Sequence, residues 1–283
     1  MTDMELLQYT FFQHALLGSL LASIICGLVG TYIVTRRLVF ISGGLTHASF
    51  GGIGLGLYMG IPPLLPAAAF AVLSAFGVEW LSKRKDMRED SAIAVFWALG
   101  MAVGIIFTFL SPGYAPDLSA YLFGNILTIT RGDLVLPGIL AVALTAFFAL
   151  YMRPIVGVAF DREFARSQGI PVQVLEYVMM MFIALTIVAC LRMVGIVLVI
   201  SLLTIPQMTA NLFTYRFRSI IGLSIAIGCI SCLGGLYVSF RWNIPSGASI
   251  IFLSILIYMV CKGGKTLASA ARHRTTIRKT ENH

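Results

Sequence analysis

The chain has 283 residues, of which 58% are hydrophobic and only 11% are charged, whereas soluble domains carry about 25% charged residues. This composition excludes a soluble globular domain. The formal net charge of +8 would suit a nucleic-acid partner, but most of the basic residues lie next to the ends of apolar runs, where they orient membrane helices. We therefore expect membrane lipid around the chain and no nucleic-acid partner.

Two long runs near the N-terminus contain no charged residue. The first covers the 30 residues between Glu5 and Arg36, and the second covers the 41 residues between Arg37 and Glu79. Because a membrane helix needs about 20 apolar residues, the second run holds two crossings. Strands of a membrane barrel would alternate apolar and polar residues, and these runs are continuous. The sequence therefore predicts an all-α, polytopic helical membrane protein.

Breaks in the apolar pattern predict about nine spans, with eight or ten as alternatives. Pro62, Pro63 and Pro66 split the second run, because proline lacks the helical donor and restricts the residue before it. The resulting tight turn makes the second and third spans antiparallel. The predicted spans are 12–35, 41–61, 62–81, 91–110, 134–152, 172–191, 193–215, 219–240 and 245–261.

The basic residues predict the orientation of these spans. When the spans alternate sides, 17 of the 20 Lys and Arg residues fall on one side, and only Arg131, Arg192 and Arg241 do not. The side rich in Lys and Arg is cytoplasmic, so we expect the N-terminus outside and the C-terminus inside.

A single transmembrane domain is expected over residues 1–262, followed by a basic cytoplasmic tail over 263–283. Between spans four and five, residues 111–132 include an uncharged piece that is too short to cross the membrane. This segment is predicted to be external or re-entrant.

The second span has small residues at every fourth position. Gly44, Ala48, Gly52 and Gly56 form a stripe that lets another helix approach closely. Two interpretations stay open: the stripe serves tight packing alone, or it packs helices along a substrate path.

His47 lies on the neighbouring face of the same span, between Gly43 and Gly51. An imidazole inside a membrane needs a partner or water, so this ring either bonds to a neighbouring helix or contacts a substrate. Neutral imidazole suits divalent metals such as Zn²⁺. One histidine does not make a metal site.

The cytoplasmic loop 153–171 carries the local signals of a short helix. Asp161 is a good N-cap, Glu163 lies in the first turn, and Gly169 can take the left-handed conformation that follows a helix. These signals predict a helix over 162–168.

The predicted loop helix exposes Phe160 and Phe164 beside charged residues. A helix lying on the bilayer surface is one interpretation. A plug that docks into a cytoplasmic partner is the other.

The sequence contains no motif that indicates a catalytic site. Gly264-Lys265-Thr266 resembles the end of a phosphate-binding loop, but Met259 stands where that loop needs a glycine. Acidic residues lie almost entirely outside the spans or at their ends, so no paired carboxylates or nucleophile with base can assemble. We expect no catalytic residues and no ATP hydrolysis by this chain.

Five segments in order resemble a known family. They are an arginine pair and the span-two segment (36–49), the external segment (117–127), the capped loop (160–169), a segment before the eighth span (192–210) and Pro245-Ser246-Gly247 at the last span. Together they resemble the membrane permease subunits of bacterial ABC importers for zinc, manganese and iron.

The resemblance implies a homodimer that lines one translocation path in the bacterial cytoplasmic membrane. Two cytoplasmic ATPase subunits and an extracytoplasmic metal-binding protein would complete the importer, with no permanently bound cofactor and a divalent metal as cargo. His47 would lie on the metal path. The residues implied in coupling to the ATPase are Asp161, Glu163, Phe164, Ala165 and Gly169.

The sequence departs from the family at Gly43, where the family has an aspartate one helical turn before the histidine. Either another residue supplies the oxygen ligand, or the ion passes without a strong site, or the substrate differs. An ABC permease for a chelated metal or siderophore is therefore an alternative. A secondary metal transporter is another, although it would require acidic residues at mid-membrane.

Overall fold

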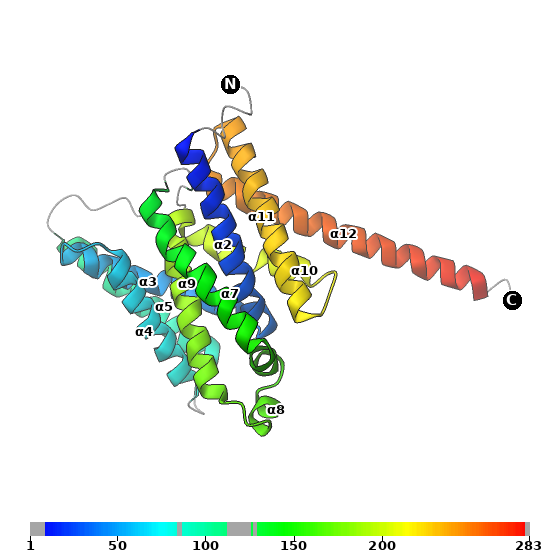
Figure 1. Ribbon diagram of the computed structural model, residues 1–283, viewed down its shortest axis with the longest axis horizontal. Coiled ribbons are helices and arrows are strands. Elements are labelled where there is room, and N and C mark those ends of the chain that lie inside the picture. Colours follow the sequence, from blue (N-terminus) through cyan, green and yellow to red (C-terminus); the bar gives the residue numbers. More distant parts are fainter. Residues whose placement is uncertain (1–8, 84–86, 112–125, 127–128, 281–283) are drawn as a thin grey trace.

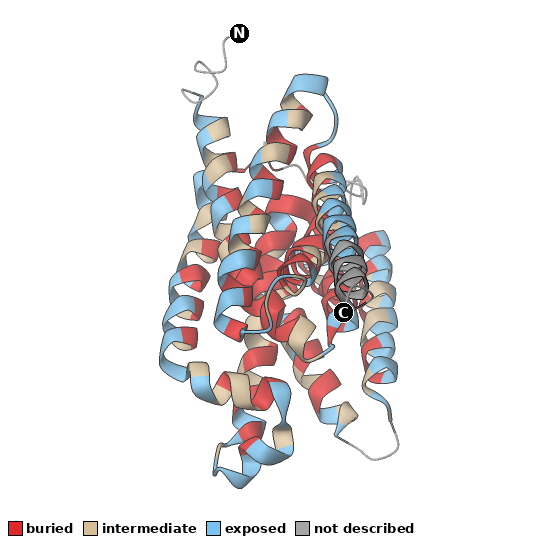
Figure 2. Cartoon of the chain, turned by 90° about the vertical axis from the view of Figure 1, so that its right-hand side faces the viewer, coloured by how far each residue is buried: buried red, intermediate tan, exposed pale blue. Residues whose placement is uncertain are grey.

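The structure is a computed structural model that describes residues 9–83, 87–111, 126 and 129–280, with side chains described through residue 267. Within these ranges the chain is helical and no strand is present. The helices form one bundle with its buried residues along the middle, and the last helix runs out of it (Figures 1 and 2). The predicted all-α fold class is confirmed.

The first half of the bundle consists of four long helices. They are α2 (Thr10–Thr35), α3 (Val39–Tyr58), α4 (Leu64–Ser82) and α5 (Glu89–Leu110). Gly60 follows α3 with a φ of +68°, a conformation that glycine adopts without strain, and Pro63 immediately precedes α4. α3 packs along both α4 and α5.

The second half contains α7 (Arg131–Phe160), α8 (Arg162–Ser167), α9 (Val172–Leu202), α10 (Ile205–Ala210), α11 (Phe217–Trp242) and α12 (Ser246–Thr280). α7 is longer than the predicted span of 134–152, so the predicted loop 153–171 begins as the last turns of α7. Pro154 does not end the helix, because the non-helical backbone of Tyr151 absorbs the kink.

α9 covers the predicted span 172–191 and continues into the predicted span 193–215, whose later part contains α10. The chain kinks at Gly195, whose φ of 77° and ψ of 168° belong to a region that is essentially restricted to glycine. In the sequence, only Arg192 interrupts the apolar run before Gly195. The predicted break between the two spans is therefore close to the observed kink, but the helix was predicted to end there.

Seven helical stretches of the described chain are long and apolar enough to span a membrane. The predicted sixth span and most of the seventh fall within a single one, Val172–Ala210, and α3 is not among them. α3 is not counted because its glycine, serine and threonine residues lower its hydropathy. The same small residues permit close packing, and α3 is largely buried. The count of nine spans and the sides of the two termini stay predictions.

Two predicted segments fall partly outside the described residues. The external or re-entrant segment 111–132 lies there almost entirely, apart from its last residues, which lead into α7. The basic tail predicted from residue 263 continues α12 as a helix through Thr280, and residues 281–283 lie outside.

Candidate functional site

The stripe of small residues on α3 packs against α4 and α5 of the same chain. Its members are Gly44, Ala48, Gly52 and Gly56, and the residues that they meet are, in the same order, Ile93, Gly100, Ala67 and Pro63. A Cβ on Gly52 would fall on the backbone of Pro66 and Ala67, which cannot yield by a side-chain rotation. The stripe therefore fixes α3 between its neighbours.

His47 reaches a half-exposed position on α3. It is the one residue between Ile41 and Gly54 that is not buried. Its imidazole stacks on the indole of Trp97 from α5, with ring centroids 4.5 Å apart and ring planes within 6°. Its Nδ1 atom is buried without a hydrogen-bond partner. The ring is therefore held by stacking, and none of the described residues engages its Nδ1 atom in a hydrogen bond.

Trp97 also lies beside Gly43. An ideal Cβ on Gly43 would stand 3.7 Å from the indole and 3.9 Å from Ile200 of α9. Trp97 could not be recognised from the sequence, because its contact with residues 43 and 47 depends on how α5 packs on α3. An aromatic residue inside an apolar helix carries no signal of its own for such a contact.

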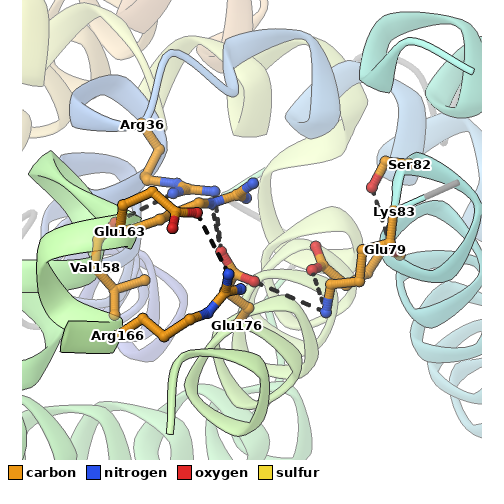
Figure 3. Close-up of polar contacts among 9 residues, drawn as sticks. Arg36, Glu79, Ser82, Lys83, Val158, Glu163, Arg166 and Glu176 are labelled. Carbon is orange, nitrogen blue, oxygen red and sulfur yellow. Dashed lines mark hydrogen bonds and ion pairs between the residues drawn. The ribbon is translucent and has the colours of Figure 1, made fainter. Parts of the chain in front are cut away.

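At the end of the bundle that carries α8, several charged side chains converge on Glu176 of α9 (Figure 3). Its Oε1 atom lies 3.3 Å from Nη2 of Arg36 and 2.5 Å from Nε of Arg162. Arg36 also donates to the carbonyl oxygen of Val158 at 3.1 Å. The carboxylate is only 4% exposed, so it depends on these partners for its charge.

A second carboxylate extends this cluster to α4. Glu79 is 1% exposed and its Oε1 atom lies 2.9 Å from Nζ of Lys83, which stands 3.8 Å from Oε2 of Glu176 (Figure 3). Lys83 also lies over the ring of Tyr177, 4.4 Å from its centroid. We call Arg36, Glu79, Lys83, Arg162 and Glu176 the charged cluster.

The charged cluster was not predicted from the sequence, because acidic residues at the ends of spans were considered only as candidate catalytic groups. A signal was present, since Glu176 lies within the predicted span 172–191 and a charge in an apolar run requires a partner. The identity of that partner could not be read from the sequence.

The predicted loop helix is confirmed as α8. Oδ1 of Asp161 accepts a hydrogen bond from the Phe164 amide at 3.0 Å, and Gly169 has a φ of +75°. After the helix, the amide of Ile170 donates to the Ala165 carbonyl at 3.2 Å. These bonds satisfy both ends of a helix too short to be stable alone.

The faces of α8 differ in their exposure. Phe164 and the neighbouring Phe160 are 59% and 62% exposed, whereas Ala165 is 1% exposed. The Ala165 methyl group lies against α7, 3.7 Å from where a Cβ on Gly157 would stand. Ala165 therefore belongs to the seat of α8 on the bundle, and the surface that a partner can meet is aromatic.

At the opposite end of the bundle, Arg192 of α9 pairs with Asp133 of α7 at 2.6 Å. Asp133 also forms a capping box with Thr130, so this pair anchors the start of α7. Arg192 and apolar residues of α3, α4 and α9 line a cavity of about 220 Å³. None of the described residues that line it is acidic.

No group of three or more His, Cys, Asp or Glu side chains that could hold a metal ion occurs in the described part of the chain. A metal ion that met His47 would therefore need ligands from outside the described residues, such as water or another copy of the chain.

The chain has the features of a transport protein: apolar spans, a closely packed glycine-rich helix and a capped helix at one end. The ABC 3 transport family matches residues 8–262. The chain belongs to this family, which confirms the resemblance seen in the sequence. It is a permease subunit and a multi-pass protein of the cytoplasmic membrane.

Similar proteins agree with this assignment. The chain is 38% identical over 257 residues to an uncharacterized membrane protein, slr2045, of Synechocystis sp., covering 90% of this chain and 91% of that protein. It is 33% identical over 254 residues to the manganese transport system membrane protein MntC of Halalkalibacterium halodurans, covering 90% and 87%. A solved structure described as PsaBC from Streptococcus pneumoniae in complex with Fab matches with a TM-score of 0.81 at 26% identity, over 91% and 93% of the two chains.

Proposed function

We propose that this chain is the permease subunit of an ATP-driven importer of divalent metal ions, namely manganese, zinc or iron. Two copies line the translocation path, two ATPase subunits bind at the cytoplasmic end, and an extracytoplasmic protein delivers the ion. The name of the MntC relative supports manganese among these ions. His47, half-exposed on α3, is the residue of this chain proposed to meet the ion.

The charged cluster is the observation that carries this proposal. Arg162 is the first residue of α8, and its partner Glu176 also binds Arg36 of α2 and approaches Lys83 of α4. A displacement of α8 therefore acts directly on three long helices. Rigid elements joined in this way can pass a movement at one end of a bundle to a path within it.

The aromatic residues Phe160 and Phe164 form the proposed contact with the ATPase. Large exposed aromatic side chains are typical anchors of protein interfaces. Asp161 and Gly169 fix the two ends of α8, and Glu163, which is 83% exposed, adds charge at the rim of this contact.

The test is uptake of isotopic manganese, zinc and iron into proteoliposomes that contain this chain with an ABC ATPase and a metal-binding protein from the same organism, with and without ATP. ATP-dependent accumulation of one of these ions is expected. Accumulation only of a chelated metal would replace the bare ion by a chelate as the cargo. Uptake that is independent of ATP would overturn the importer in favour of a secondary transporter.

A further inference from the structure

The pair formed by His47 and Trp97 leads beyond the proposed function, on which this inference rests for the path itself. We propose that Trp97 is a specificity-determining residue. Its indole fills the space beside His47 where an oxygen ligand on residue 43 would stand. The path thereby meets the ion with imidazole nitrogen and an aromatic face, which admits transition-metal ions and rejects Mg²⁺ and Ca²⁺.

The geometry makes residue 43 and Trp97 competitors for one space. Residues 43 and 47 lie one turn apart on α3 and so project to the same side. A Cβ on residue 43 would have ordinary contact with the indole, at 3.7 Å and 4.0 Å from two of its carbons. A methyl group therefore fits, but a longer side chain that turns toward His47 has to displace Trp97.

Neither side chain of the pair, His47 and Trp97, offers an oxygen ligand. An indole donates one hydrogen bond and accepts none, so Trp97 offers a cation only its ring face. Mg²⁺ and Ca²⁺ require several oxygen ligands, whereas imidazole suits zinc and iron and binds Mn²⁺ more weakly. The expected order of affinity is Zn²⁺, then Fe²⁺, then Mn²⁺, with Mg²⁺ and Ca²⁺ far behind.

Stacking also explains how a single histidine is kept ready for an ion. Nδ1 is buried without a hydrogen-bond partner among the described residues, and the nearly parallel indole, with ring centroids 4.5 Å apart, sets the plane of the imidazole. An imidazole bound to a metal carries positive charge, which the face of an indole attracts. Trp97 therefore holds the ring and favours its metal-bound form without a carboxylate.

The first test reads binding from Trp97 itself. The full chain is placed in lipid nanodiscs with Trp80→Phe and Trp242→Phe, so that Trp97 is its only tryptophan, and is titrated with Zn²⁺, Mn²⁺, Mg²⁺ and Ca²⁺. Zn²⁺ is expected to change the Trp97 emission at a concentration well below that of Mg²⁺ or Ca²⁺, because imidazole suits Zn²⁺ whereas Mg²⁺ and Ca²⁺ require oxygen ligands. His47→Ala is expected to remove the response. Equal responses to all four ions would overturn the proposal.

Matched variants at residue 43 test the competition for space. Gly43→Asp is expected to strengthen the response to Ca²⁺, because Ca²⁺ prefers oxygen ligands, whereas Gly43→Ala adds a methyl group without oxygen and should leave the ion order unchanged. The same ion order in both variants would contradict the proposal. If Gly43→Asp does not fold, Gly43→Asp combined with Trp97→Phe gives the carboxylate more room, and competition by Ca²⁺ against Zn²⁺ uptake is then the readout.

Binding and transport separate the two proposals. If the wild-type assembly moves no metal but the emission follows the expected ion order, the importer is wrong, and only selective ion binding by the pair of His47 and Trp97 stands. If uptake occurs and Trp97→Ala leaves competition by Mg²⁺ and Ca²⁺ as in the wild type, the importer stands and the role of Trp97 is overturned. Trp97→Phe, which keeps an aromatic face, should retain the wild-type selectivity.

Discussion

Arg162 and Glu176 form an ion pair of 2.5 Å between the first turn of α8 and the first turns of α9. The same carboxylate oxygen lies 3.3 Å from Arg36 of α2 (Figure 3). Guanidinium groups from two elements therefore share one buried oxygen atom. A movement of α8 that displaces Arg162 would also change the position of the Glu176 carboxylate relative to Arg36. This sharing gives the short helix its mechanical connection to the bundle.

Glu176→Gln is expected to destabilise the protein, because the amide keeps the size of the side chain and leaves Arg36 without its charged partner. The loss should be about 2 kcal/mol, below the value of about 3–5 kcal/mol for a fully buried pair, since Arg162 and Lys83 can turn toward solvent. Thermal unfolding in detergent measures it. Glu163→Gln is the control, because its pair with Arg166 is exposed and such pairs contribute about 0–1 kcal/mol. Equal melting temperatures of the two variants would contradict the importance of the charged cluster.

Phe164→Ala should weaken binding of the ATPase, and the permease should stay as stable as the wild type. The side chain is 59% exposed, and surface substitutions change stability by about 0.5 kcal/mol or less. Co-purification of the ATPase and stimulation of its activity by the permease measure the effect. Leu150→Ala removes a side chain of similar size that is 79% exposed on α7 and should bind the ATPase normally. Retained co-purification in Phe164→Ala would remove Phe164 from the interface.

Ala165→Asp should detach α8 from α7, because a carboxylate would enter a position that is 1% exposed. Burial of an unpaired charge is strongly unfavourable, so the helix must move away or unfold. Limited proteolysis between α7 and α9 should become faster. Ser167→Asp puts the same charge on the exposed side of α8 and should change cleavage little. If both variants are cleaved alike, the seat of α8 on α7 is weaker than the packing indicates.

Features encoded over a few neighbouring residues could be predicted from the sequence. The helix α8, its cap at Asp161 and the left-handed Gly169 follow from local hydrogen-bonding rules. The stripe on α3 was also predictable, because its spacing of four residues is a property of the helix itself.

Features that join distant parts of the chain were not predictable. Trp97 and His47 are 50 residues apart, and Glu176 meets Arg36 across 140 residues, so both contacts depend on which helices become neighbours. The kink of α9 at Gly195 escaped prediction for a different reason. Its glycine follows a charged residue, Arg192, and this combination indicates a complete break as readily as a kink.

Gly52→Ala is expected to destabilise the bundle by about 1–3 kcal/mol. The added methyl group would fall on the carbonyl of Pro66 and on Ala67 Cα, and backbone atoms can yield only if α4 moves away from α3. The measurement is the thermal unfolding of the purified chain in detergent. Gly222→Ala on α11 is the matched control, because nothing lies within 4 Å of its added Cβ and alanine is a better helix former than glycine by about 1 kcal/mol. The two variants should therefore shift the melting temperature in opposite directions, and a gain in stability from Gly52→Ala would show that α3 and α4 are not held at this contact.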